Sequence, residues 1–216
     1  MRYPLLVFDW DGTLIDSART IVACIQAACR DLGLTIPDEA RASHVIGLGL
    51  KDALSYAIPG LPTDDYGRVV ESYRKHFLAR DPEIPLFPGT QEMLAGLRAR
   101  GHVLAIATGK SRAGLKRALH NTGLEPLFAA SRCADECASK PAPDMLSELM
   151  EELGSEAVDT LMIGDTVHDL QMAAHAGVQA VAVSHGAHPR GDLVALSPLA
   201  CLENIDELAR WLFQNA

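Results

Sequence analysis

The stretch Leu5-Leu6-Val7-Phe8-Asp9-Trp10-Asp11-Gly12-Thr13 joins a short apolar run to two aspartates. An apolar run that stops at a polar residue is typical of a strand buried on both faces of a parallel sheet. Ligands of open α/β sheets bind in the crevice outside the carboxyl ends of such strands. The stretch therefore predicts a parallel sheet whose first strand delivers Asp9 to a binding site.

Two further apolar runs end in the same way. Residues 103–107 lead into Thr108, and residues 161–163 lead through a glycine into Asp165. Because the carboxyl ends of parallel strands meet at one edge of the sheet, we expect Asp9, Thr108 and Asp165 to converge.

The predicted site is strongly acidic. Asp9, Asp11, Asp165 and Asp169, crowded together, could not all stay ionised without a compensating cation, because like charges raise one another's pKa. A hard divalent metal with oxygen ligands, Mg²⁺ in the first place, would provide that charge. Lys140, in the segment Ser139-Lys140-Pro141, would add to it. The sequence therefore predicts a magnesium site.

Length and composition restrict the class of protein. The 216 residues have room for one main domain with a small insertion, and 48% hydrophobic with 22% charged residues is an ordinary globular composition. No apolar stretch reaches the roughly 18 residues of a membrane span, and no secretory signal is evident. A net charge of −9 without a basic run disfavours nucleic-acid and anionic-membrane partners.

The five cysteines are odd in number and lack CxxC or zinc-finger spacing. They predict a reduced, cytoplasmic setting.

Spacing indicates where the insertion lies. Asp9 and Thr108 are 99 positions apart, whereas a βαβ unit takes about 30 residues, so roughly 60 to 70 residues are surplus. Apolar residues at helical spacing predict helices within this surplus, and three prolines between positions 82 and 88 would return the chain to the sheet. We expect a helical cap domain at 17–85 and an α/β core domain at 1–16 and 86–216; the predicted cap helices are 18–32, 50–57 and 64–79.

Beyond the cap, helices alternate with strands, which predicts a doubly wound, mainly parallel sheet. The expected helices are 90–100, one from the N-cap Ser111 to about Gly123, 143–153, 169–176 and 205–213, and the expected later strands are 128–131 and 180–183.

Together the motifs resemble those of the haloacid dehalogenase-like (HAD) hydrolase superfamily, and the resemblance covers the whole chain. The segment Asp9-Trp10-Asp11-Gly12-Thr13 is similar to the first motif of that family, and Thr108 to the second. Lys140 is similar to the third motif, and Gly164-Asp165 with Asp169 to the fourth. The layout with a small helical cap resembles the phosphoglycolate phosphatase-like group, which implies a Rossmann-like core.

The resemblance implies that Asp9 is a nucleophile that forms an aspartyl-phosphate, and that Asp11 protonates the leaving oxygen and later activates water. It implies that Mg²⁺ is held by Asp9, the backbone carbonyl of Asp11 and Asp165, with Asp169 orienting a water molecule at the metal.

Three further residues would bind the transferring phosphoryl oxygens by the same resemblance: Thr108, the Gly109 N–H group and Lys140.

The implied activity is Mg²⁺-dependent hydrolysis of small phosphomonoesters, phosphoglycolate among them, by a monomer or small homo-oligomer. Haloacid dehalogenases of this superfamily lack an acid at the position of Asp11, which favours a phosphatase. A phosphosugar mutase or a pyrophosphatase stays open, since the mutase uses the same two aspartates. A receiver-type phosphoacceptor domain also gathers aspartates, a threonine and a lysine, but its acceptor follows a middle strand, and it carries no inserted cap.

Within the cap, residues 47–51 resemble the family's substrate-specificity segment, with Leu48 and Lys51 as candidate contacts and His44 nearby. His185 and His188 follow a strand and could line the cleft, although an exposed loop is the commoner place for histidines.

Overall fold

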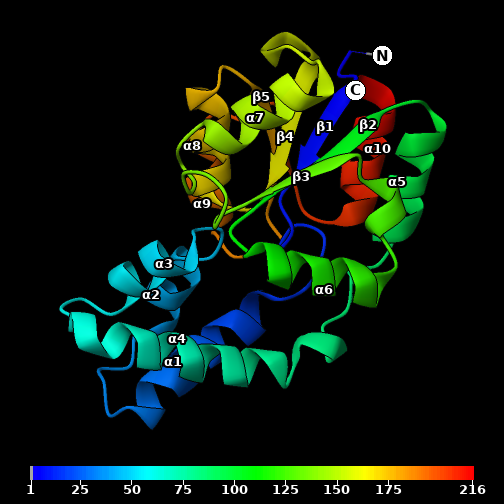
Figure 1. The fold of residues 1–216 in the computed structure, drawn as a ribbon. Coiled ribbons are helices and arrows are strands. Elements are labelled where there is room, and N and C mark those ends of the chain that lie inside the picture. The colour runs from blue at the N-terminus through cyan, green and yellow to red at the C-terminus, as the bar shows by residue number, and fades with distance from the viewer. Residues whose placement is uncertain (1) are drawn as a thin grey trace.

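The computed structural model describes residues 2–216. Its centre is a six-stranded sheet in the order β3-β2-β1-β4-β5-β6, in which each neighbouring pair is parallel (Figure 1). This confirms the predicted doubly wound sheet. The strands are β1 (Leu5–Phe8), β2 (Val103–Thr108), β3 (Ala130–Cys133), β4 (Thr160–Gly164), β5 (Gln179–Val183) and β6 (Cys201–Leu202).

The strand order reverses beside β1. The chain moves from β1 outward to β2 and β3, and then returns to β4 on the other side of β1. In doubly wound sheets the ligand crevice lies at such a reversal, outside the carboxyl ends of the strands. Phe8 pairs with Ile163 at the ends of β1 and β4, so the two acidic motifs leave the sheet side by side.

Helices cover both faces of the sheet, which explains why β1 is apolar at every position. Leu6 and Phe8 pack toward α5 (Thr90–Ala99), α6 (Arg112–Thr122) and α10 (Ile205–Asn215). Leu5 and Val7 pack on the opposite face. That face is covered by α7 (Asp144–Leu153) and α8 (Val167–His175).

A helical insert lies at the carboxyl ends of the strands and has its own core around Ile25, Leu54 and Val69 (Figure 1). The segments that join it to the sheet run side by side, since Asp16 N–H donates to the Pro85 carbonyl at 3.0 Å. Domain boundaries at 16/17 and 85/86 stay a prediction. The insert consists of α1 (Ala18–Asp31), α2 (Glu39–His44), α3 (Leu50–Ala57) and α4 (Thr63–Leu78).

Most element positions agree with the sequence-based prediction, and the differences are in short elements. The strand expected at 128–131 lies two residues later, at β3, because a 3₁₀ turn at Glu125–Leu127 comes before it. Not predicted were α2, β6 and α9 (Arg190–Val194). The helix ends expected at Gly123 and Gly154 are confirmed: both glycines are left-handed caps, with φ of 70° and 64°.

No helix among the described residues is long and apolar enough to cross a membrane.

Candidate active site

Asp9 lies immediately after β1 and is completely buried. Lys140 Nζ is 2.8 Å from its Oδ1 atom, whereas its Oδ2 atom has no hydrogen-bond partner among residues 2–216. Burial raises the pKa of Asp9 well above its usual range; Lys140 opposes this shift, and Asp169 and Asp165 add to it. A buried carboxylate oxygen without a partner is uncommon in a folded protein and indicates a functional group.

Lys140 joins two of the acidic groups. Its Nζ atom is 2.7 Å from Asp169 Oδ1 as well as 2.8 Å from Asp9 Oδ1, and its side chain is fully buried. Burial disfavours the ammonium ion, but the attraction of Asp169 and Asp9 outweighs it and raises the pKa of Lys140 above its usual value. The site therefore contains a fixed positive charge that is held in place by carboxylates.

Asp169 is held by the first turn of α8. Thr166 is the N-cap of this helix, and Asp169 accepts hydrogen bonds at Oδ2 from the Thr166 N–H group (3.0 Å) and hydroxyl (2.7 Å). The two residues form a capping box. The helix therefore begins two residues before the predicted position 169, because Thr166 has the extended backbone of an N-cap and Asp169 is the third helical residue.

Asp165 is enclosed by backbone and by one hydroxyl group. Thr13 Oγ1 donates to its Oδ1 atom and the Ala187 N–H group to its Oδ2 atom, both at 2.7 Å. Burial, with Asp169 as the next cause, raises the pKa of Asp165 to about 7. A Cβ atom on Gly12 would be 2.2 Å from Asp165 Oδ2, and one on Gly186 would be 2.1 Å from it. Only glycine fits at these two positions.

The residues present fit a divalent cation. Carboxylate oxygens of Asp9, Asp165 and Asp169 lie within 4.8 Å of one another, and all three residues are completely buried. Lys140 offsets only part of this negative charge. Carboxylate oxygens are the ligands that Mg²⁺ prefers, and each oxygen has a second lone pair beyond its present hydrogen bond.

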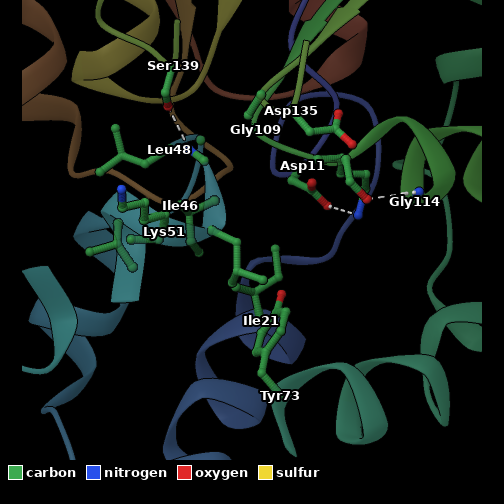
Figure 2. Close-up of a pocket in the computed structure, with 18 of the residues that line it drawn as sticks. Asp11, Ile21, Ile46, Leu48, Lys51, Tyr73, Gly109, Gly114, Asp135 and Ser139 are labelled. Atoms are coloured by element: carbon green, nitrogen blue, oxygen red, sulfur yellow. Dashed lines mark hydrogen bonds and ion pairs between the residues drawn. The ribbon is translucent and has the colours of Figure 1, made fainter. Parts of the chain in front are cut away.

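Asp11 lies close by but its carboxylate has different partners. Ser17 Oγ donates to Asp11 Oδ1 at 2.7 Å, and Lys110 Nζ is 3.1 Å from the same oxygen. The side chain faces the cleft between the sheet and the helical insert (Figure 2). The Asp11 carboxylate does not belong to the group formed by Asp9, Asp165 and Asp169. Its backbone carbonyl is therefore the atom left for the expected metal contact.

Strand β2 ends at Thr108, and the next residue, Gly109, packs against the backbone of the insert. Thr108 is buried, and its Oγ1 atom accepts a hydrogen bond from Lys110 N–H at 3.2 Å. A Cβ atom on Gly109 would be 2.5 Å from the Leu48 carbonyl oxygen and 2.6 Å from that of Gly47. Gly109 therefore permits the backbone of the insert to approach the strand ends.

Three histidines from distant parts of the sequence, His44, His168 and His188, lie together at the contact between insert and sheet. The Nε2 atoms of His168 and His188 donate to the His44 carbonyl oxygen, at 2.7 and 3.1 Å. His188 Nδ1 accepts from the Val167 N–H group, which places the ring proton on Nε2. Ring nitrogens of the three residues lie within 4.8 Å of one another, but their sequence positions are too far apart for any spacing rule to join them.

His188 is buried, unlike the exposed loop histidine that is commoner. Burial, followed by the effect of His168, lowers its pKa to about 4, so the ring is neutral. His185, also in this loop, hydrogen-bonds to the Thr13 carbonyl at 3.2 Å.

Of the expected specificity residues, Leu48 and Lys51 line the cleft (Figure 2). His44 instead packs against Tyr56 and His188.

A doubly wound parallel sheet with a helical insert, and a buried carboxylate–lysine centre at its switch point, define a capped α/β enzyme of Rossmann-like topology. Residues 6–183 match the family described as haloacid dehalogenase-like hydrolase. The chain belongs to this hydrolase family.

Curated relatives and solved structures agree with this assignment. The chain is 37% identical to the probable phosphatase IndB of Dickeya dadantii, over 95% of this chain and 91% of that protein. It is 31% identical to a phosphoglycolate phosphatase of Synechococcus elongatus, over 97% of both. The crystal structure of a hydrolase from Pseudomonas syringae has the same fold, with a TM-score of 0.87, 23% identity and 98% of each chain covered. The chain is thus placed in the phosphoglycolate phosphatase-like group.

Proposed function

We propose that the chain is a Mg²⁺-dependent phosphatase that hydrolyses small phosphomonoesters through an aspartyl-phosphate on Asp9. The observation that carries this proposal is the buried Asp9 Oδ2 atom, which has no hydrogen-bond partner within residues 2–216 and lies beside Lys140 and two further carboxylates. The similarity to a phosphoglycolate phosphatase supports a small phosphorylated metabolite as the substrate. The five free thiols fit a reducing compartment such as the cytoplasm.

The first step is transfer of the phosphoryl group to the protein. A phosphate monoester repels an anionic nucleophile, so its oxygens have to be bound by positive or hydrogen-bonding groups. Lys140 Nζ, the Thr108 hydroxyl and the Gly109 N–H group are the candidates. Mg²⁺, held by Asp9, Asp165 and the Asp11 carbonyl, would supply further charge neutralisation.

In that step an Asp9 carboxylate oxygen attacks phosphorus. A new oxygen–phosphorus bond forms while the bond to the leaving oxygen breaks, and Asp11 gives its proton to that oxygen. The Ser17 hydroxyl and Lys110 hold the Asp11 carboxylate at the strand-end side of the cleft, where it would face the leaving oxygen.

The second step releases phosphate. Asp11, now ionised, takes a proton from a water molecule whose oxygen attacks phosphorus, and the bond between phosphorus and Asp9 breaks. Asp9 and Asp11 are thereby returned to their starting states, so one phosphoester and one water give one alcohol and one phosphate per turnover.

Replacement of the nucleophile tests the covalent mechanism. Asp9→Asn should lower the hydrolysis of p-nitrophenyl phosphate in the presence of Mg²⁺ by about 10⁴-fold or more, because the amide is a poor nucleophile and a poor metal ligand. The matched control is Asp16→Asn, an exposed aspartate of the same segment, which should retain activity. Near-wild-type activity of Asp9→Asn in a folded protein would contradict the proposal.

A further inference from the structure

The cleft beside Asp11 is much larger than the phosphoryl group needs. It has a volume of about 730 Å³ and extends from Asp11 and Gly109 at the strand ends to α1, α3 and α4 of the insert. Clefts of roughly 300–1,000 Å³ hold drug-sized ligands. The two-carbon glycolate of phosphoglycolate would leave most of this space to water.

The wall of the cleft is largely apolar. Ile21 and Ile46 project into it, and the Tyr73 hydroxyl points into the same space from α4 (Figure 2). Tyr73 and Phe77 form an aromatic pair with ring centroids 5.8 Å apart and an angle of 21° between the rings. Burial raises the pKa of Tyr73, so its ring carries a neutral hydroxyl. Such a wall suits a flat ring with a few polar atoms.

The basic side chains that line the cleft do not form a binding site for a carboxylate on the substrate, such as that of phosphoglycolate. Lys110 is paired with Asp11 at 3.1 Å and lies 4.6 Å from the centre of the Phe77 ring. Arg117 is paired with Asp81 at 3.4 Å. Lys51 and Arg74 are exposed at the rim. A carboxylate placed two carbons from the phosphoryl group would therefore find no buried cation that lacks a partner among the described residues.

We infer that the leaving group is a nucleoside-sized alcohol whose flat ring packs on Tyr73 and the aliphatic side chains around it, which makes nucleoside 5′-monophosphates the substrate class. This inference rests on the proposed phosphatase function and refines it. The phosphoryl group would lie at Asp9, the sugar would pass Asp11 and Gly109, and the base would occupy the apolar part of the cleft. Stacking of a base on an aromatic side chain strengthens binding by roughly tenfold or more.

The test compares kcat/KM of the full chain with Mg²⁺ for four substrates: uridine 5′-monophosphate, ribose 5-phosphate, 2-phosphoglycolate and acetyl phosphate. We expect the nucleotide to exceed 2-phosphoglycolate by about tenfold or more, with ribose 5-phosphate between them. A 2-phosphoglycolate value equal to or above that of the nucleotide would overturn the substrate class while the phosphatase function stands. If none of the four is hydrolysed, the phosphatase function is wrong and the substrate class falls with it.

A pair of variants locates the ring. Tyr73→Phe keeps the ring and should keep the preference for the nucleotide, whereas Tyr73→Leu should lower kcat/KM for the nucleotide about fivefold or more and change that for acetyl phosphate less. Equal losses for both substrates would overturn the role of the ring. A second measurement needs no variant: uridine alone should inhibit acetyl phosphate hydrolysis competitively, and glycolate should not. Inhibition by glycolate but not by uridine would contradict the inference.

Discussion

At the scale of single residues, Asp9 and Asp11 are only two positions apart in the sequence but have different surroundings. Asp9 is completely buried against Lys140 and the other carboxylates, whereas Asp11 faces the cleft with Ser17 and Lys110 on its carboxylate. Strand β1 ends at Phe8, before both residues, and the turn that follows it directs the Asp9 side chain to the acidic centre and the Asp11 side chain to the cleft. The same residue type can therefore serve as nucleophile and as proton donor.

Asp11→Asn tests the proton-transfer role. The variant should slow turnover by roughly 10² to 10⁴-fold, the usual contribution of a general acid and base. The loss should be smaller for p-nitrophenyl phosphate than for an alkyl phosphate, because p-nitrophenolate leaves without a proton. Steady-state kinetics with both substrates provide the measurement. Equal losses for the two substrates would argue against Asp11 as the acid, and Asp16→Asn again serves as the control.

At the scale of elements, helix α2 is docked on the sheet domain through its last carbonyl group. The four terminal carbonyls of a helix have no partner within the helix, and the His44 carbonyl accepts instead from His168 and His188. The loop that contains His188 also holds Asp165 through the Ala187 N–H group. The position of the insert is therefore linked to the position of a proposed metal ligand.

The pair His168→Leu and His168→Gln tests this docking. Leucine removes the donor, whereas glutamine can place its amide nitrogen near the former Nε2 position. Because one such hydrogen bond contributes about 0.5–1.5 kcal/mol, we expect KM for uridine 5′-monophosphate to rise roughly 2- to 10-fold in His168→Leu, with kcat changed less. His168→Gln should restore most of the loss. If both variants show wild-type KM, the hydrogen bond to α2 has no part in substrate binding.

Elements with many periodic apolar residues were predictable from the sequence, and short ones were not. Helix α3 has the predicted bounds and α1 differs at its end by one residue, because each has a clear apolar stripe. Helix α2 has six residues of which only Ala42 is buried, and β6 has two residues, so neither contains a full period. The N-cap Asp38, which accepts from Arg41 N–H at 2.8 Å, was the one local indication of α2.

The candidate site likewise has some features that were predictable from the sequence and others that were not. Asp9 and Asp165 were predictable as neighbours because each directly follows one of two paired parallel strands. The bridge from Lys140 to Asp9 and Asp169 and the cluster around the His44 carbonyl depend on packing between distant segments. Sequence periodicity contains no information on such contacts.

At the scale of the whole molecule, the acidic centre connects folding stability to pH and to Mg²⁺. Asp165 has a pKa of about 7 in the folded protein and near 3.8 when unfolded. The folded state thus holds this proton more tightly, so without metal the stability should fall as pH rises from about 4 through 7. The proposed Mg²⁺ would bind ionised carboxylates of the folded state and so compete with that proton.

Mg²⁺ should therefore raise the melting temperature more at pH 8 than at pH 5.5. Ligand at a hundredfold excess over Kd stabilises by about 2.7 kcal/mol, which for a chain of this size is an increase in Tm of roughly 5–10 °C. At pH 5.5 we expect less than half of this increase, because Asp165 must first lose its proton. Thermal unfolding with and without Mg²⁺ at both pH values measures the effect. Glu151→Gln, which removes an exposed carboxylate, should retain the pH dependence, whereas Asp165→Asn should weaken it, with the remainder due to Asp9, whose pKa is also raised. An equal increase in Tm at both pH values in the wild-type chain would show that Mg²⁺ binding does not depend on the ionisation of Asp165, which contradicts the prediction.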